Sequence, residues 1–205
     1  MKPKGPTRVM VGLMVASMSL GVACRGDLAP GSLSPDMGTS RPRNDLPGLP
    51  NFARLDDGLY RGAQPTAEGF ARLKKMGVKT VVNLRSLHSD REEMKGLGLD
   101  YAHISFKPFM AEDEDVTAFM KVATDPDRRP VFVHCQHGAD RTGTMAAVYR
   151  VYVQGWSMER ALKELPAFGF HEIWANLPRY LADMDLADMK RQVEQASMPA
   201  LERIP

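Results

Sequence analysis

Short runs of hydrophobic residues predict four strands in the first two thirds of the chain. They lie at residues 59–60, at 78–84, where β-branched residues dominate, at 101–106 and at 131–133. The last run, Val-Phe-Val, is apolar throughout and too short for a helix. A run of this kind is typical of an interior strand that is covered on both faces.

Hydrophobic residues spaced three and four positions apart predict helices between and after these strands. The expected buried faces are Phe70, Leu73 and Met76; Val116, Phe119, Met120 and Ala123; Met145, Val148, Tyr152 and Val153; and Ile173, Leu177, Leu181 and Met184. Thr66 and Ser157 are expected to cap two helices, and residues 91–97 are a further short helical candidate. Strands that alternate with helices, followed by helices alone, predict an α/β fold with a short, mostly parallel central sheet flanked by helices.

The first 23 residues have the layout of a secretory signal peptide: residues 1–8 are basic, and residues 9–23 are uncharged and largely apolar. This apolar stretch is shorter than the roughly 20 residues that span a bilayer as a helix. Residues 20–24, Leu-Gly-Val-Ala-Cys, are similar to the processing box of bacterial lipoproteins, in which the cysteine is acylated, except that Gly21 stands where leucine is usual. The alternative is ordinary cleavage near Ala23, which leaves Cys24 as a free thiol.

We therefore expect an exported protein of the periplasm or cell envelope, associated with a membrane through a lipid on Cys24. Residues 24–50 hold five prolines among Gly, Ser and Asp without apolar periodicity, which predicts a tether. The remaining boundaries are a globular domain over residues 51–197 and a short tail over residues 198–205. The oligomeric state is left open.

Charge and cysteine content exclude several kinds of function. The first 43 residues carry six basic and two acidic side chains, and the remainder carries 21 basic and 23 acidic ones. The near-neutral main body offers no basic surface for nucleic acid. The two cysteines, Cys24 and Cys135, are too few for a disulfide framework and lack the spacing of a zinc site. Each cysteine is therefore considered by itself.

The predicted interior strand leads into residues 134–143, His-Cys-Gln-His-Gly-Ala-Asp-Arg-Thr-Gly, and a helix is expected to begin at about Thr142. The amides of a loop wrapped over a helix N-terminus point inward and bind anions, and the helix dipole adds about half a positive charge there. A phosphate group fits such a loop. Because sites of this kind favour the thiolate form of a cysteine, Cys135 is the candidate nucleophile.

Two further residues of this segment fit phosphate binding. Arg141 lies six residues after Cys135, and its planar guanidinium group can hold two phosphate oxygens at once. Gly138 allows the backbone to turn close to the anion. Arg85 is either an additional positive charge near the loop or an ordinary surface arginine.

The Cys-x5-Arg segment resembles the signature of the cysteine-dependent protein tyrosine and dual-specificity phosphatase superfamily. Residues 57–65, Asp-Gly-Leu-Tyr-Arg-Gly-Ala-Gln-Pro, and residues 78–85, Val-Lys-Thr-Val-Val-Asn-Leu-Arg, are similar to the opening strands of the compact bacterial dual-specificity type. The blocks follow one another in the same order and with similar spacing. The resemblance covers residue 51 to about residue 184.

The resemblance implies a role for each residue of the loop. Cys135 attacks phosphorus and forms a phosphocysteine, which water then hydrolyses. The residues that hold the phosphoryl group are Gln136, His137, Gly138, Ala139, Asp140, Arg141 and Thr142. Thr142 also donates to the departing sulfur, and His134 lies under the loop and hydrogen-bonds to its backbone. No cofactor and no metal ion is implied.

The general acid is the role that the resemblance leaves open. Relatives carry an aspartate on a separate loop before the cysteine, at a place that Lys107 occupies here. One substitute is the acidic run Glu112, Asp113, Glu114 and Asp115, whose alternative role is to place negative charge at a helix N-terminus. The other is Asp140, because a loop that ends in Asp-Arg-Thr resembles that of myotubularins and certain bacterial phosphatases, in which this aspartate transfers the proton. The alternative role of Asp140 is a salt bridge or cap that stabilises the loop.

The sequence therefore predicts an exported phosphomonoesterase that acts on phosphotyrosine, phosphoserine, phosphothreonine or related phosphate esters. Its substrate would be a phosphorylated protein or a small-molecule or lipid phosphate, with phosphoinositides and inositol phosphates as the alternative class. A rhodanese-like sulfurtransferase and a catalytically silent lipoprotein that binds phosphorylated ligands are two further alternatives. The presence of both Cys135 and Arg141 in the loop favours a phosphatase over the sulfurtransferase and over the silent lipoprotein. His103 and His171 are expected to be structural histidines.

Overall fold

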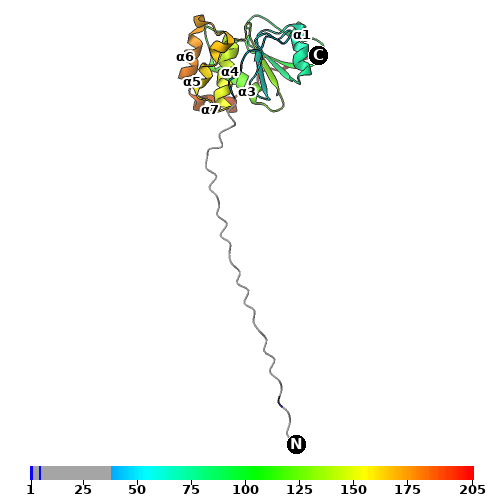
Figure 1. Cartoon of the computed structure of the whole chain (residues 1–205), viewed down its shortest axis with the longest axis vertical. Helices are drawn as coiled ribbons and strands as arrows, with labels where there is room; N and C mark the ends of the chain where they lie inside the picture. Colours follow the sequence, from blue (N-terminus) through cyan, green and yellow to red (C-terminus); the bar gives the residue numbers. More distant parts are fainter. Residues whose placement is uncertain (2–4, 6–37) are drawn as a thin grey trace. The chain divides into compact units, whose positions relative to one another are not determined.

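The computed structural model of the chain describes residues 1, 5 and 38–205 (Figure 1). The predicted signal peptide, apart from residues 1 and 5, lies outside the described residues, as do Cys24 and the predicted tether as far as residue 37. Among the residues that are described, none of the helices is both long enough and apolar enough to cross a membrane.

In this part of the chain, six strands form one sheet in the order β1-β2-β5-β3-β4-β6. Their bounds are β1 (Ala53–Arg54), β2 (Leu59–Gly62), β3 (Thr80–Asn83), β4 (Leu99–His103), β5 (Val131–His134) and β6 (Glu202–Ile204). The four middle strands run parallel, and β1 and β6 pair antiparallel with β2 and β4 at the two edges. The predicted α/β fold with a mostly parallel sheet is confirmed.

Strand β5 lies between β2 and β3, and its side chains alternate between two hydrophobic cores. Val131 and Val133 belong to the core on one face of the sheet, whereas Phe132 belongs to the core on the other. All three are completely buried, which confirms the predicted interior strand. As a consequence, the residues that follow β5 emerge at the middle of the sheet edge.

Seven α-helices and two 3-10 helices accompany the sheet in the described residues. They are α1 (Ala67–Lys75), α2 (Arg91–Met94), α3 (Asp113–Thr124), α4 (Asp140–Tyr152), α5 (Met158–Leu162), η1 (Leu165–Phe168), η2 (Glu172–Trp174), α6 (Asn176–Asp183) and α7 (Leu186–Gln195). Helix α1 covers one face of the sheet, and α3 to α7 gather on the other (Figure 1). Nearly every residue of α4 is buried, so this helix is held firmly behind the loop that precedes it.

The predicted caps are confirmed, because the hydroxyl groups of Thr66 and Ser157 each accept a backbone N–H in the first turn of α1 and α5. Three positions of the predicted buried faces are wrong. Met76 and Val153 stand at the C-caps of α1 and α4, and Ile173 lies in η2 before α6 begins. These side chains are 37%, 38% and 81% exposed, because helical periodicity does not continue past a helix end.

The packed part of the chain begins before residue 51, so the predicted tether is too long. Leu49 is 1% exposed and lies in the same core as Phe52. The backbone N–H of Ser40 donates to a carboxylate oxygen of Glu164 at 2.7 Å, and Arg150 Nη2 donates to Ser40 Oγ at 2.7 Å. The apolar residues of this segment stand singly among prolines, so no periodic pattern reveals their burial.

The predicted tail is also part of the fold. Residues 202–204 form β6, which adds an antiparallel edge strand to β4, with Leu99 opposite Ile204. Ile204 is 3% exposed and completes the core that contains Phe132. A run of three residues is too short for strand periodicity to be recognised in the sequence.

We predict that Leu49→Ala destabilises the protein by about 2–5 kcal/mol, since it removes a buried leucine side chain and leaves a cavity. The free energy of unfolding from urea titration measures this. Leu87→Ala is the matched control, because it makes the same chemical change at a side chain that is 101% exposed. The control should change stability by less than about 0.5 kcal/mol. An equally small effect of Leu49→Ala would show that residues before 51 do not contribute to the core.

Candidate active site

The loop of interest connects the central strand β5 to the helix α4. The register pairs His134, at the end of β5, with Gly62 of β2 and Asn83 of β3. The segments that follow these three strands therefore lie side by side at the carboxyl edge of the sheet. Helix α4 begins at Asp140, two residues before the predicted start at Thr142. The loop proper thus comprises residues 135–139.

Cys135 is a free cysteine at the base of this loop, and it is 1% exposed. The next two residues, Gln136 and His137, are exposed to solvent. Helix α4 follows with 13 residues, and its N-terminus places partial positive charge at the loop. The hydroxyl oxygen of Thr142 is buried and has no hydrogen-bond partner within the described structure. It is therefore a free donor in the first turn of α4.

Gly138 is required by the close approach of the loop to the end of β2. Its φ angle is +69°, and a Cβ atom added there would lie 2.5 Å from backbone atoms of Gly62 and Ala63. No other residue fits this position without moving the backbone. The predicted role of Gly138 as a turning point is consistent with this geometry.

Arg61 of β2 is buried and contacts the same glycine. No functional role was predicted for Arg61 from the sequence. Its Nη2 donates to the carbonyl oxygen of Gly138 at 2.8 Å, and its guanidinium carbon lies 3.7 Å from the ring centre of Phe168. Burial lowers the pKa of Arg61 to about 10, while the charges of Glu164 and Cys135 oppose that shift. Arg61 stays protonated at neutral pH. The sequence signal that could have identified Arg61 is its charge in the short strand Leu-Tyr-Arg-Gly, whose other residues are uncharged.

Arg141 is half-buried and lies on the first turn of α4. Its Nη1 donates to the carbonyl oxygen of Leu84 at 3.3 Å, immediately after β3. The guanidinium group is therefore positioned beside the carboxyl end of the sheet, where the backbone of Leu84 also pairs with His134. A planar donor group at this place can turn toward an anion in the loop.

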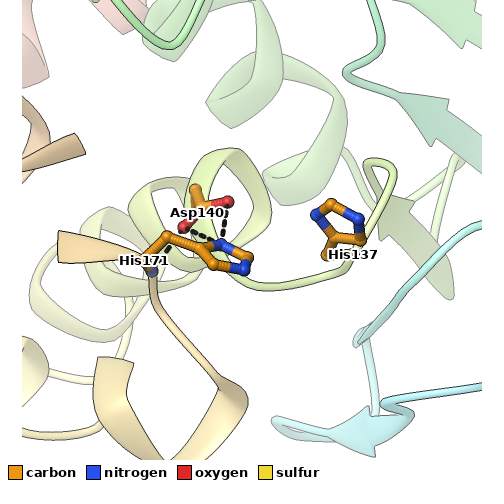
Figure 2. Close-up of side chains that lie close together, drawn as sticks. All are labelled: His137, Asp140 and His171. Atoms are coloured by element: carbon orange, nitrogen blue, oxygen red, sulfur yellow. Dashed lines mark hydrogen bonds and ion pairs between the residues drawn. The ribbon is translucent and has the colours of Figure 1, made fainter. Parts of the chain in front are cut away.

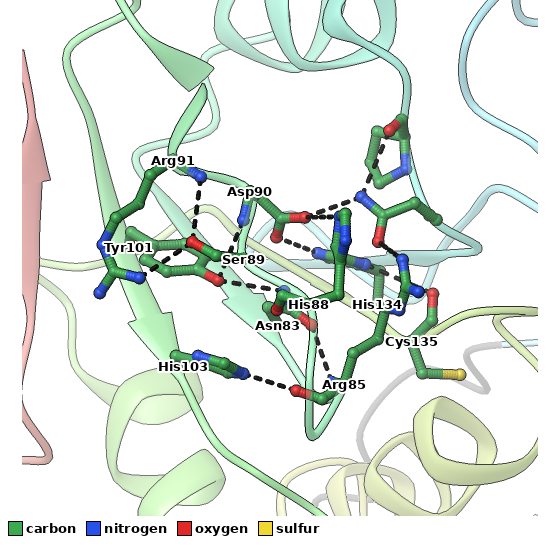
Figure 3. A network of polar contacts seen from close by, with 12 residues as sticks. Asn83, Arg85, His88, Ser89, Asp90, Arg91, Tyr101, His103, His134 and Cys135 are labelled. Carbon is green, nitrogen blue, oxygen red and sulfur yellow. Dashed lines mark hydrogen bonds and ion pairs between the residues drawn. The ribbon is translucent and has the colours of Figure 1, made fainter. Parts of the chain in front are cut away.

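A polar network lies under the loop (Figure 3). His134 Nε2 contacts a carboxylate oxygen of Asp90 at 2.8 Å. Its Nδ1 contacts the backbone oxygen of Cys135 at 3.4 Å, which is the predicted contact with the loop backbone. Gln64 donates to the other oxygen of Asp90 at 2.7 Å and accepts from Arg85 at 2.8 Å. Figure 3 shows the sulfur of Cys135 directed away from this network.

Asp90 remains ionised in this network. Burial acts to raise its pKa, but the hydrogen bond and charge of His134, together with the Gln64 hydrogen bond and the charge of His88, hold the pKa below its usual range. Arg85 belongs to the same network, because its Nη1 donates to Gln64. Asp90 was missed because it stands in a polar stretch without a motif.

Asp140 forms a pair with His171, which comes from the segment before η2 (Figure 2). The backbone N–H of His171 donates to Asp140 at 2.8 Å, and its Nδ1 lies 3.0 Å from both carboxylate oxygens. The ring of His137 stands 5.3 Å from that of His171. The fold brings His171, which was predicted to be a structural histidine, to the end of the loop, where its ring pairs with Asp140. The three residues have ligand atoms close enough to hold a metal ion.

The acidic residues 112–115 lie at the start of α3. Asp113 accepts a hydrogen bond from Tyr180 of α6 at 2.7 Å. Burial, together with the charges of Glu112 and Glu114, raises the pKa of Asp115 to about 6, although the charge of Lys107 lowers it. Of the two predicted sources of the general acid, only Asp140 is on the first turn of α4 beside the loop.

The comparisons with known proteins agree with this geometry. The family described as PTP-NADK, a DSP-PTPase phosphatase fused to NAD+ kinase, matches residues 51–173, which is more than half of the chain. The chain is similar to the dual specificity protein phosphatase TpbA of Pseudomonas aeruginosa, with 35% identity over 121 residues that cover 58% of this chain and 55% of TpbA. The match therefore spans about half the length of this curated relative.

A second relative and a solved structure extend the comparison. The inositol diphosphatase DSP5 of Arabidopsis thaliana is 24% identical over 152 residues, which cover 69% of this chain and 73% of DSP5. The crystal structure of a P. aeruginosa TpbA variant in complex with pTyr is similar with a TM-score of 0.66 and 28% identity, and it covers 76% of this chain and 97% of that chain. The chain therefore belongs to the DSP-PTPase family of cysteine-dependent protein tyrosine and dual-specificity phosphatases.

Proposed function

We propose that this protein hydrolyses phosphate monoesters through a cysteinyl-phosphate intermediate. The observation that carries the proposal is the position of Cys135 between the end of β5 and the N-terminus of α4, with Arg141 on the first turn of that helix. The backbone amides of residues 136–141 and the guanidinium of Arg141 would hold the transferring phosphoryl group. The family match supports this assignment, because the loop lies inside the matched residues 51–173.

The reaction has two steps. In the first, the thiolate of Cys135 bonds to phosphorus while the bond from phosphorus to the leaving oxygen breaks, and an acid residue protonates that oxygen. In the second, water attacks phosphorus, the bond to sulfur breaks, and the same residue takes up a proton from the water. Thr142, whose hydroxyl has no other partner within the described structure, would donate to the sulfur as it leaves.

Phosphotyrosine and related aryl phosphates are the substrates that we propose first. TpbA, named a dual specificity protein phosphatase, shares 35% identity with this chain, and a TpbA variant was solved with pTyr. Inositol phosphates are the second class, because the relative DSP5 is named an inositol diphosphatase. A panel of phosphopeptides, phosphoinositides and inositol phosphates, assayed with the wild type and Cys135→Ser, distinguishes the two classes.

We also propose that the protein is exported and that a lipid on Cys24 holds it to a membrane. The support is the sequence pattern of a basic segment, an apolar segment and small residues that end in a cysteine. The substrate would then be encountered outside the cytoplasm.

We predict that Cys135→Ser abolishes turnover of a generic aryl phosphate, since a serine hydroxyl is not ionised at neutral pH. The thiol of the wild type should react with iodoacetamide, and orthophosphate should protect it by filling the loop. The Cys135→Ser chain measures the background reaction of Cys24 in the same assay. Retained turnover in Cys135→Ser would remove the nucleophile assignment. Thiosulfate-to-cyanide transfer without phosphatase activity would instead support the sulfurtransferase.

We predict that Asp140→Asn slows a poor leaving group by roughly 100-fold or more and a good leaving group by less than about tenfold. The reason is that a positioned acid matters only when the leaving oxygen needs a proton. The values of kcat for an alkyl phosphate and an activated aryl phosphate measure the difference. Equal slowing of both substrates would exclude Asp140 as the proton donor.

Asp115→Asn is the matched comparison, because it neutralises the alternative carboxyl group. We predict no dependence on the leaving group, but a stability that changes with pH. Since burial raises the pKa of Asp115 to about 6, the ionised carboxylate costs the folded state free energy as pH rises through that value. Asp115→Asn should therefore raise the melting temperature at about pH 8 and leave it unchanged at about pH 4. Leaving-group dependence in this variant would transfer the acid role to Asp115.

A further inference from the structure

We propose that His137, Asp140 and His171 bind one divalent transition-metal ion, best fitted by zinc, at the rim of the loop. One ligand atom from each residue lies within 4.8 Å of the others. Two imidazole nitrogens and one carboxylate oxygen are a donor set that zinc binds in proteins. Ligand atoms on one tetrahedral zinc ion stand roughly 3.4 Å apart. The two exposed imidazole rings therefore need only a small rotation to close on an ion.

The side chains of Asn51 and Arg61 fix the two segments that carry the histidines. Asn51 Nδ2 donates to the carbonyl oxygen of His137 at 2.9 Å and to that of Phe168 at 3.0 Å. Arg61 makes a second link, because it donates to Gly138 and stacks over the ring of Phe168. These two side chains join the loop that carries His137 to the segment just before His171. The three proposed ligands are thus brought together by the fold.

Asp140 supplies an oriented carboxylate. It is 6% exposed, and the backbone N–H of His171 donates to its Oδ1 at 2.8 Å. This bond fixes the carboxylate without using the imidazole ring. The contact of His171 Nδ1 with both oxygens shows that the ring already faces the carboxylate (Figure 2). A metal ion would replace the proton shared between them, and that proton would pass to solvent.

A simple salt bridge between Asp140 and His171 does not account for His137. The ring of His137 makes no hydrogen bond among the described residues, and its one ring contact is with His171 at 5.3 Å between centroids. Both ring nitrogens of an exposed, unbonded histidine are available to a metal. Three protein ligands leave a fourth position open, as in zinc sites that also bind water or a substrate oxygen.

An ion at this position would also act on the proposed reaction, a consequence that rests on the proposed function. Asp140 cannot hold a proton for the leaving group while it is bound to zinc. Zinc should therefore inhibit turnover of poor leaving groups more than turnover of good ones. Binding itself does not depend on catalysis, so it is measured first.

The test is titration of the full, reduced chain with Zn²⁺ against a chromogenic chelator of known affinity. We expect one ion bound at this site, with affinity weakened by about tenfold or more in both His137→Ala and His171→Ala. His103→Ala is the control, because this exposed histidine contacts the backbone of Arg85 and lies outside the cluster. Circular dichroism of each variant confirms that it is folded.

Cys135→Ser separates the proposed site from a thiolate site. We expect this variant to bind zinc as the wild type does, and X-ray absorption at the zinc edge to show nitrogen and oxygen ligands without sulfur. Loss of binding in Cys135→Ser, unchanged binding in both histidine variants, or no binding by the wild type would each overturn the proposal. If Cys135→Ser lacks turnover but binds zinc normally, the metal site and the phosphatase assignment stand separately. A chain that binds zinc but lacks turnover of every phosphate ester would overturn the function alone.

Discussion

A loop that binds an anion must turn its N–H groups inward, and its carbonyl oxygens must then find partners elsewhere. In this protein the carbonyl oxygen of Gly138 is taken by Arg61, whose guanidinium group is buried beneath the loop. This bond directs the carbonyl oxygen of Gly138 toward Arg61. A buried cation also needs compensation, and the charges of Glu164 and Cys135 provide it. Arg61 thus fixes the loop at Gly138 and places a buried positive charge beneath it.

The surroundings of the loop explain how these charges are tolerated. Strand β5 is sandwiched between two hydrophobic cores, and α4 is buried almost throughout, so neither anchor of the loop moves readily. Asp90 and His134 satisfy one another under the first loop residue. Glu164 is paired with Arg150 at 2.7 Å, and Ser40 bridges both. The segment before residue 51 therefore contributes to the support of the site.

Asp140 connects the proposed chemistry with the proposed metal site. It starts α4, where a carboxylate interacts favourably with the helix dipole, and it is held by His171 from a distant part of the chain. A group in this position can hold a proton or bind a metal ion, but it cannot do both at once. Zinc at the rim would therefore regulate the reaction by competition for one carboxylate.

The sequence by itself determined the alternation of strands and helices, the interior strand, two helix caps and the Cys-x5-Arg loop, because each depends on residues close together in the chain. It did not reveal the contacts that Arg61, Asp90 and His171 make with the site, because their partners lie 77, 44 and 31 residues away. The predicted boundaries left Leu49 and Ile204 outside the globular domain, because isolated apolar residues show no helical or strand periodicity. Which distant side chains meet is decided by strand order and by the packing of both faces of the sheet. Only the tertiary structure therefore showed what holds the loop in place and what lies at its rim.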